Sequence, residues 1–410
     1  MLTILQRLVS NPQKALLLFD ETLHHLFLAY AIPLVQYGIS VGVISTTIAN
    51  ALKIKIKKTK IEGVYTTNHT LSKPSILCFS SGSKNSQKGI VRTYESWQHS
   101  FNLIKDELLD FPKSKAIVLG ELPYSLSLFG AMESLHRGQQ PLVFPNHEIR
   151  YFTQRLSNQN YILWVTPLHC SFFIKAFENK IMEPIHTIKY VFVGGAQFSN
   201  NQRSKLQKVF PKAKIYSFYG ASETSFIALK YPQDNSNSVG HICKGVQVSI
   251  RNEAKQKMPE NSVGSIWVKS CSNFDSYLDK SLKINTLDGY ISINDLGFLD
   301  DQNRLFFAGR AERHISVKGH IIDLNALERW YKDILAIETL ALLGQSNEEK
   351  ENELVLLTTQ QLTPKIWQSL KKKAQHALGT QAVPKKWLHC QSWPLLANGK
   401  TDYITLLKCL

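Results

Sequence analysis

Short apolar runs and helical periodicities alternate along the first half of the chain. Each apolar run is bounded by proline, glycine, serine or threonine, which is typical of buried strands. The predicted strands are Ser75–Phe79, Ala116–Leu119, Pro141–Phe144, Ile162–Val165 and Tyr190–Val193. Apolar residues at helical spacing predict helices over Val91–Leu109 and near Leu126–Leu135. Because strands and helices alternate, the sequence predicts a large α/β domain of layered sheets and helices.

Beyond Gly240 the pattern changes to short strands and turns. Strands over Val246–Ile250 and Gly264–Val268 are followed by a hairpin-like run at Leu305–Ala308. After Gly309, a lysine-rich segment has a small α+β pattern of its own. Its predicted elements are helix Asn325–Ile334, strands Thr339–Leu343 and Glu353–Thr358, and helix Lys365–Leu378. The sequence therefore predicts a large domain over residues 1–309 and a small α+β domain over residues 310–410.

The segment Leu26–Leu52 carries no charge and is followed by several lysines, so by length it could cross a bilayer. Polar residues, proline and glycine interrupt it, however. This favours a buried helix that ends at Gly38, a strand through Val43 or Ile44, and a second helix. A transmembrane segment stays the alternative. Arg7 is an isolated charge with no small-residue cleavage site after it, so no cleavable signal is expected.

Length and composition place the chain among folded globular proteins. Its 410 residues favour two domains, and 43% hydrophobic with 20% charged residues is typical of a packed core. The net charge of +16 suits nucleic acid, an anionic membrane surface, or anionic small molecules such as ATP and coenzyme A. No block of Lys and Arg interleaved with aromatic residues is present. We therefore expect small anions and no nucleic acid, and leave peripheral membrane contact open.

The six cysteines are scattered and form no CxxC pair. This spacing argues against a structural zinc site and for a reducing compartment, so we expect a cytoplasmic protein, with membrane association left open.

A loop rich in serine follows the predicted strand Ser75–Phe79. Glycine lets a backbone approach phosphates closely, hydroxyl and N–H groups donate to their oxygens, and lysine supplies a positive charge. The loop is not a Walker A sequence, because the second glycine and the Lys-Ser/Thr pair are absent from their places. Its candidate phosphate-binding residues are Ser80, Ser81, Gly82, Ser83, Lys88 and Gly89.

Four further stretches follow this loop in a fixed order. They are Gly194-Gly195-Ala196, Tyr219-Gly220-Ala221-Ser222-Glu223-Thr224, Asp288-Gly289-Tyr290 with Asp295-Leu296-Gly297 and Gly309-Arg310, and Asn398-Gly399-Lys400. Together with the loop they resemble the adenylate-forming superfamily of acyl-CoA synthetases, peptide-synthetase adenylation domains and luciferases. The resemblance covers about Ser75 to Asp402 and is closest in style to a short bacterial acyl-CoA synthetase. It implies binding of ATP and Mg²⁺ and a mobile C-terminal domain.

The resemblance also implies roles for single residues in the nucleotide site. Tyr219 would stack on adenine, Ser222 would donate to the α-phosphate, and Glu223 would hold Mg²⁺. The plain alternative is that Ser222 or Glu223 caps a helix starting near Thr224. Gly194, Gly195 and Ala196 would form the glycine turn at the acyl pocket.

Four more residues take their roles from the later stretches. Asp295 would accept hydrogen bonds from the ribose hydroxyls, and Arg310 would reach the ribose or phosphate. Lys400 would bring a positive charge to the carboxylate and α-phosphate, and Glu312 would be the hinge. The plain alternatives are that Asp295 is an ordinary turn residue, that Arg310 is an exposed charge on a linker, and that Lys400 is a solvated lysine.

The sequence departs from the family pattern at several points. The usual Thr-Gly-x-Pro-Lys-Gly is Lys84-Asn85-Ser86-Gln87-Lys88-Gly89, the usual Thr-Gly before the ribose aspartate is Ile293-Asn294, and Glu312 replaces the usual hinge aspartate. The chain is also short ahead of the loop. None of these changes removes a group that the chemistry needs, so the enzyme interpretation holds, with a non-catalytic nucleotide- or acyl-binding relative as the alternative.

The predicted acyl pocket points to the class of acid. Amino-acid-activating members carry an aspartate in a stretch that aligns with Tyr124-Ser125-Leu126-Ser127, where this chain has Ser125. A buried ammonium without a counter-charge is costly, so an uncharged tail is expected. The pocket residues are Tyr124, Ser125, Phe129, Phe218 and Phe226. The resemblance thus implies that a fatty or aromatic acid is adenylated and passed to the thiol of coenzyme A, with an acyl-carrier protein as the alternative acceptor.

Overall fold

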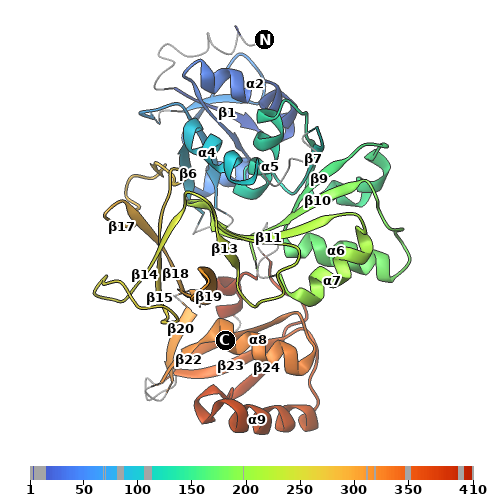
Figure 1. Ribbon diagram of the computed structural model, residues 1–410, viewed down its shortest axis with the longest axis vertical. Helices are drawn as coiled ribbons and strands as arrows, with labels where there is room; N and C mark the ends of the chain where they lie inside the picture. The colour runs from blue at the N-terminus through green and yellow to red at the C-terminus, as the bar shows by residue number, and fades with distance from the viewer. Residues whose placement is uncertain are drawn as a thin grey trace. The chain divides into compact units, whose positions relative to one another are not determined.

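The computed structural model describes two compact units (Figure 1). The described residues are 3, 15–67, 69, 71–80, 87–105, 113–196, 198–310, 313–317, 320–346, 352–395 and 401–408. The larger unit holds the described residues up to Val248 together with Val268–Ile291. The smaller unit holds Ser249–Trp267 and most of the described residues from Ser292 onward. The predicted boundary between residues 309 and 310 stays a prediction.

The N-terminal part of the larger unit is a strand, a helix, a second strand and a second helix. Strand β1 (Leu16–Asp20) is followed by α2 (His24–Gln36), β2 (Ser40–Ile44) and α3 (Thr46–Ala51). Helix α2 ends just before Gly38, which has a φ of 102°, a value that favours glycine. The predicted helix–strand–helix is thus confirmed. Across the stretches of chain described above, every helix is too short or too polar to span a bilayer.

These strands belong to a seven-stranded sheet of the order β16-β6-β5-β2-β1-β4-β3. The remaining bounds are β3 Ile56–Lys58, β4 Val64–Thr67, β5 Ser75–Phe79, β6 Gly89–Thr93 and β16 Ser276–Tyr277. Strands β1, β2 and β5 run parallel, and β6 returns antiparallel to β5. The loop rich in serine therefore connects two paired strands, β5 and β6.

The prediction of one helix over Val91–Leu109 was wrong at its start. Residues up to Thr93 belong to β6, and helix α4 begins at Tyr94 and runs to Lys105. The side chains of Ile90 and Val91 pack into different cores, as they do on opposite faces of a strand. The Thr93 hydroxyl then accepts a hydrogen bond from the Ser96 backbone N–H at 3.1 Å, which favours the start of a helix. Residues 106–112 lie outside the described residues.

The second sheet of the larger unit has the strand order β13-β12-β11-β10-β9-β7-β8. Its bounds are β7 Lys115–Leu119, β8 Leu142–Phe144, β9 Tyr161–Val165, β10 Ile188–Val193, β11 Lys214–Ala221, β12 Ser225–Lys230 and β13 Gly240–Ile242. Strands β8, β7, β9, β10 and β11 are mutually parallel. Because carboxyl ends of parallel strands meet at one edge, the turns after them lie close together.

Helices separate and cover the two sheets of the larger unit (Figure 1). The main core lies between the sheets and includes side chains of α2, α4 and α5 (Ser125–His136). A second core packs α6 (Pro167–Glu178) and α7 (Asn200–Val209) on the outer face of the second sheet, and a third lies on the outer face of the first sheet with α3. This layering confirms the predicted α/β fold.

The smaller unit consists mainly of strands, two longer helices and the short helix α10 (Tyr403–Leu407). The strands are β14 Gln247–Arg251, β15 Gly264–Lys269, β18 Tyr290–Leu299, β19 Arg304–Arg310, β20 His314–Val317, β21 His320–Asp323, β22 Leu340–Ser346, β23 Asn352–Thr358 and β24 Lys386–His389. Helices α8 (Leu324–Leu335) and α9 (Pro364–Leu378) pack on one face of the β22–β24 sheet. The predicted C-terminal α+β pattern is confirmed.

We expect Phe19→Ala to destabilise the larger unit strongly. Phe19 has an exposed fraction of 0% and contacts Phe27 of α2 edge to face, with ring centroids 5.7 Å apart. Removing a buried phenyl ring leaves a cavity that lowers the free energy of unfolding by about 3–5 kcal/mol. Chemical denaturation measures this. The control Tyr37→Ala, at a side chain that is 55% exposed, should change stability by less than about 0.5 kcal/mol. Equal effects of the two variants would contradict the buried packing of β1.

Candidate active site

Ser80 and Lys88 close the base of the serine-rich loop. The Ser80 N–H donates to the Lys88 carbonyl at 2.9 Å, and the Lys88 N–H donates to the Ser80 hydroxyl at 2.8 Å. The two ends of the loop are therefore held together by backbone geometry and one serine side chain. The candidate residues Ser81, Gly82 and Ser83 lie outside the described residues.

Gly89 and Lys88 contact the short strand β16. A Cβ at Gly89 would come within 2.8 Å of the Leu278 Cβ, so the close approach of β16 requires glycine here. The pairing continues with Tyr277 opposite Ile90. The Lys88 ammonium lies 5.0 Å from the centre of the Tyr277 ring, within the range of a cation–π contact.

The stretch Tyr219–Thr224 forms the end of a β-hairpin. Strand β11 ends at Ala221, β12 begins at Ser225, and these two residues face each other. A Cβ at Gly220 would overlap the Ser225 carbonyl oxygen, so the hairpin requires glycine. Because a strand follows Thr224, the alternative of a helix capped by Ser222 or Glu223 is wrong. The Thr224 hydroxyl instead accepts from the Ala221 N–H at 3.1 Å within the turn.

Glu223, in this turn, is held by two contacts with β16 and the segment before it. The Tyr277 hydroxyl donates to the Glu223 Oε1 at 3.0 Å, and the Phe274 N–H donates to the Glu223 carbonyl at 2.7 Å. Burial and the neighbouring Glu223 carboxylate raise the pKa of Tyr277, so its phenol remains a protonated donor at neutral pH. The carboxylate is half-buried and fixed in direction, as a metal ligand requires.

The glycine turn lies at the carboxyl end of β10, beside the end of β11. Val193 faces Ser217 in the parallel ladder, so Gly194 comes next to Phe218. A Cβ at Gly194 would overlap the Phe218 ring, which therefore lies against the bare backbone. Gly195 has a φ of 87°, a value that favours glycine, and it is exposed together with Ala196. The structure thus brings this turn and the Tyr219–Thr224 hairpin to one sheet edge.

The predicted acyl-pocket phenylalanines belong to one aromatic cluster. The rings of Phe218 and Phe226 are 4.4 Å apart between centroids, and those of Phe226 and Phe129 are 4.9 Å apart. Trp164 contacts Phe129 at 5.1 Å and fills the space above Gly130. The structure therefore brings Phe129, Phe218 and Phe226 together with Trp164 in the main core, and their role in an acyl pocket stays a prediction.

Tyr124 and Ser125 lie at the start of α5, near the base of the loop. The Gln87 amide donates to the Tyr124 hydroxyl at 3.4 Å, and the backbone of Tyr124 bridges that of Phe79. Ser125 hydrogen-bonds the Cys78 thiol. Burial raises the pKa of Cys78 to about 12, which the charge of Arg92 and this hydrogen bond oppose. The thiol is therefore uncharged at neutral pH.

Four residues of this region were not predicted from the sequence: Cys78, Arg92, Trp164 and Tyr277. Cys78 and Trp164 lie inside apolar runs, where they look like ordinary core residues. Tyr277 lies in a strand too short to be recognised by alternation. Arg92 did carry a signal, because a charged residue inside the apolar run at Gly89–Thr93 is unusual for a buried strand.

Asp295 and Arg310 face each other across an antiparallel pair in the smaller unit. Asp295 is buried in β18, and the backbone of Arg310 ends β19. The side chain of Arg310, the predicted hinge residue Glu312 and Lys400 lie outside the described residues. On either side of residues 396–400, Leu395 bridges Thr401, and the Trp393 indole donates to the Thr401 hydroxyl at 3.1 Å.

Glu328 is the centre of a buried polar network in the smaller unit. Its carboxylate forms an ion pair with Arg313 and accepts hydrogen bonds from the Leu342 N–H at 2.8 Å and the Tyr403 hydroxyl at 2.9 Å. The Arg313 guanidinium also lies 3.8 Å from the centre of the Tyr403 ring. The network joins α8, β22 and α10 (Tyr403–Leu407), so Glu328 is a packing residue.

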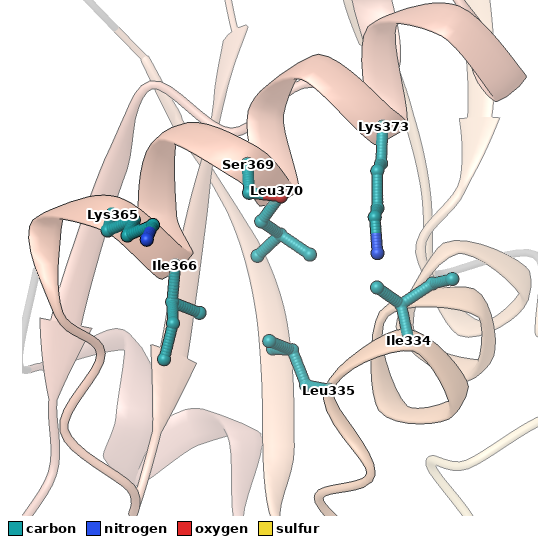
Figure 2. Close-up of a pocket in the computed structure, with 7 residues that line it drawn as sticks. All are labelled: Ile334, Leu335, Lys365, Ile366, Ser369, Leu370 and Lys373. Atoms are coloured by element: carbon teal, nitrogen blue, oxygen red, sulfur yellow. The ribbon is translucent and has the colours of Figure 1, made fainter.

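A groove of about 300 Å³ lies between α8 and α9 (Figure 2). It is lined by Ile334, Leu335, Lys365, Ile366, Ser369, Leu370 and Lys373. None of these seven residues is a predicted site residue. They belong to the smaller unit, whereas the loop and the hairpin belong to the larger unit. We therefore place the candidate active site at the carboxyl edge of the second sheet in the larger unit.

Comparison with known families gives a match over much of this unit. A family model described as AMP-binding enzyme matches residues 25–278. An uncharacterized acyl–CoA ligase of Bacillus subtilis, YhfT, is 26% identical over 333 residues, covering 80% of this chain and 67% of that protein. A putative long chain fatty acid–CoA ligase of Staphylococcus haemolyticus, VraA, is 24% identical over 328 residues, with 78% and 67% covered. The chain thus spans about two thirds of the length of these relatives.

Solved structures share the fold at low sequence identity. O-succinylbenzoate coenzyme A synthetase of Bacillus subtilis, in complex with ATP and magnesium, has a TM-score of 0.73 at 14% identity, with 98% of each chain covered. The amide bond synthetase McbA of Marinactinospora thermotolerans has a TM-score of 0.71 at 16% identity, with 97% of this chain and 80% of that chain covered. These likenesses again confirm the predicted fold class.

We expect Tyr277→Phe to lower stability through Glu223. The variant keeps the ring but removes the hydroxyl that donates to the Glu223 carboxylate, and losing a hydrogen bond to a charged group costs about 1.5–3 kcal/mol. The matched control is Tyr290→Phe, whose hydroxyl donates to the Gln247 side chain at 3.1 Å in an exposed position. Its loss should stay below about 0.5 kcal/mol by denaturant unfolding. If the two losses are equal, Tyr277 does not hold Glu223.

Proposed function

The chain belongs to the AMP-binding enzyme family, and on this basis we propose that it is an AMP-forming acid–thiol ligase. It would activate a carboxylic acid with ATP and transfer the acyl group to the thiol of coenzyme A. The observation that carries the proposal is the fixed carboxylate of Glu223 in the β11–β12 hairpin, beside Lys88 and the closed base of the loop. One carboxylate and one lysine near a serine-rich loop suit the triphosphate of a nucleotide.

The reaction has two steps that balance. A carboxylate oxygen of the acid attacks the α-phosphorus of ATP, the bond from that phosphorus to the bridging oxygen breaks, and pyrophosphate leaves. The sulfur of the thiol then attacks the acyl carbon, the carbon–oxygen bond to the phosphate breaks, and AMP leaves while the thiol proton passes to solvent. Neither step needs a covalent enzyme intermediate, so the protein contributes positioning and charge stabilisation.

Residues of the larger unit would bind the nucleotide. Tyr219 is half-buried at the carboxyl end of β11, where its ring can stack on adenine. Ser222, in the hairpin turn, would donate to the α-phosphate. A single protein carboxylate is sufficient for Mg²⁺, which usually binds one or two carboxylates together with substrate phosphates, so Glu223 fits that ion. When bound, Mg²⁺ would neutralise phosphate charge.

The family resemblance assigns further roles to residues beyond Ser292. Asp295 would accept hydrogen bonds from the ribose hydroxyls, and Arg310 would contact the ribose or phosphate. Lys400 would stabilise negative charge on the carboxylate and α-phosphate during the first step only. Rotation of the C-terminal domain about Glu312 would then withdraw Lys400 before the thiol attacks.

The acid would have no ammonium group near Ser125 and would be fatty or aromatic. Ser125 has no charge, and the side chains of Phe129, Phe218 and Phe226 form an apolar cluster. The names of two relatives, an acyl–CoA ligase and a long chain fatty acid–CoA ligase, favour the same class.

A carrier protein is the second candidate acceptor. The observation that favours it is a relative in Listeria monocytogenes, a D-alanine–D-alanyl carrier protein ligase, that is 26% identical over 356 residues and covers 80% of this chain. Such an acceptor would present a thiol on a phosphopantetheine arm, which coenzyme A also contains, so the first reaction step would be the same.

Pyrophosphate release with a panel of carboxylic acids tests the proposal directly. We expect release that depends on ATP, Mg²⁺ and one class of acid, with no release from free α-amino acids. Adding coenzyme A, then a carrier protein, identifies the acceptor by which thioester forms. Tight ATP binding without pyrophosphate release from any acid would support a non-catalytic nucleotide-binding protein instead.

We expect Glu223→Gln to slow adenylation by roughly 10²-fold while leaving the fold intact. The amide keeps the shape and can still accept from Tyr277, but it lacks the charge that would hold Mg²⁺. Pyrophosphate release and the thermal midpoint are measured on the same sample. The control Glu253→Gln, at an exposed turn, should leave both unchanged. A fall in the thermal midpoint with an unchanged rate would give Glu223 a structural role only.

We expect Lys400→Ala to separate the two half-reactions. Formation of the acyl-adenylate should slow by roughly 10²-fold or more, the usual effect of losing one charge-stabilising group. The second step, started from supplied acyl-adenylate and coenzyme A, should be nearly unchanged. The control Lys408→Ala, at an exposed position, should alter neither step. Loss of the second step alone would show that Lys400 contacts coenzyme A, which contradicts the proposed role.

A further inference from the structure

Arg92 is a positive charge inside the larger unit. Its side chain lies in β6 with an exposed fraction of 1%. The Nε atom donates to the Ser96 hydroxyl at 3.1 Å, and Nη2 donates to the Ser96 carbonyl, the Ser100 hydroxyl and the Ser272 carbonyl at 3.0, 2.6 and 3.0 Å. Every one of these acceptors is neutral.

Among the described residues, no carboxylate forms an ion pair with Arg92. The hydrogen bonds of its guanidinium come from Nε and Nη2. Burial lowers the pKa of Arg92 to about 10, so the guanidinium remains charged at neutral pH. A buried charge without a partner is strongly unfavourable. The Nη1 atom carries two N–H donors that a ligand could use.

Arg92 lies next to the predicted acyl pocket. Its guanidinium is 4.4 Å from the centre of the Trp97 ring, and Trp97 stacks on Phe129 with centroids 6.2 Å apart. Its charge also acts on the Cys78 thiol, which hydrogen-bonds Ser125. Phe129 and Ser125 are both predicted pocket residues. The Arg92 guanidinium and the serine that replaces the amino-acid-binding aspartate therefore belong to one region.

This region thus carries a positive charge, whereas an acid with an ammonium group would need a negative one. A guanidinium prefers carboxylates, and hydrogen bonds between two charged groups are shorter and stronger than neutral ones. We infer that the acid activated by this chain carries a second carboxylate, and that Arg92 binds it through Nη1. This inference rests on the proposed function and narrows its substrate from a fatty or aromatic acid to a dicarboxylic acid with an apolar body.

Arg92 also has a possible structural role that an experiment must separate. Its bonds to Ser96 and Ser100 of α4 and to the Ser272 carbonyl join the helix to the segment that holds Glu223. Substitution would therefore destabilise the unit whatever the substrate is. A purely structural role would reduce the rate with every acid alike, whereas a binding role changes the ratio of rates between acids with one and with two carboxylates.

The experiment measures kcat/KM for pyrophosphate release with acids matched in size. Hexanoate is paired with adipate, and benzoate with isophthalate. We expect the full-length protein to prefer the dicarboxylic acid in at least one pair by about 10- to 100-fold, the effect of one hydrogen bond between charged groups. Arg92→Met should abolish that preference, and Arg92→Lys should retain part of it because the charge is kept.

The matched control is Arg203→Met in the same unit. Arg203 is also buried, with an exposed fraction of 6%, and it donates to the Tyr231, Pro232 and Asp234 carbonyls on α7's side of the second sheet. Its loss should destabilise the protein without changing the ratio between the two acids. If Arg92→Met does not fold, the inference is still tested by the preference of the unmodified protein and of Arg92→Lys for the dicarboxylic acid.

Four outcomes would overturn the inference. If the unmodified protein prefers the monocarboxylic acid in both pairs, its substrate does not carry a second carboxylate. An unchanged ratio in folded Arg92→Met, or an equal change in Arg203→Met, gives Arg92 a structural role. In these cases release with monocarboxylic acids leaves the proposed ligase function standing. Absence of release with every acid would instead reject the ligase function and this inference together.

Discussion

The backbone pairing of β16 with β6 is the constraint on which the candidate site depends. It brings residues 270–278, far along the chain, beside the strand that follows the serine-rich loop. Three contacts then become available at once: Tyr277 reaches Glu223, Lys88 lies over the Tyr277 ring, and the Ser272 carbonyl accepts from Arg92. Gly89 is needed for the pairing because Leu278 leaves no room for a side chain. The loop, the hairpin and the buried cation are therefore parts of one arrangement.

The sequence pattern predicted most of the fold wherever an element is strongly apolar. Strand Ser75–Phe79 has the predicted bounds, because every residue in it is buried. Helix α7 was not predicted, since its surface is mostly polar and only a few of its side chains reach the core. The start of α4 was misplaced because Ile90 and Val91 extend its apolar pattern, although they belong to a strand. Pairing with β5 and β16, which local sequence does not contain, decides that boundary.

The candidate site was predicted in its residue types better than in its local structure. Ser222, Glu223 and Thr224 are favourable both in a hairpin turn and at the start of a helix, so composition could not choose between them. The pairing of β11 with β12 decides for the hairpin. Tyr277 and Arg92 could not be assigned roles from the sequence, because their partners are distant in the chain. The presence of Arg92 in an apolar, strand-like run was nevertheless a sign in the sequence that this residue is unusual.

The contact between Gly194 and Phe218 links two positions in evolution. The ring of Phe218 lies where the Cβ of any other residue at 194 would be, so the backbone turn and the aromatic wall cannot change independently. A descendant that gained a side chain at 194 would first need a smaller residue at 218, and such a change would also uncover Phe226. New substrate preferences in this lineage should therefore arise by ordered pairs of substitutions, with the change at 218 preceding the change at 194.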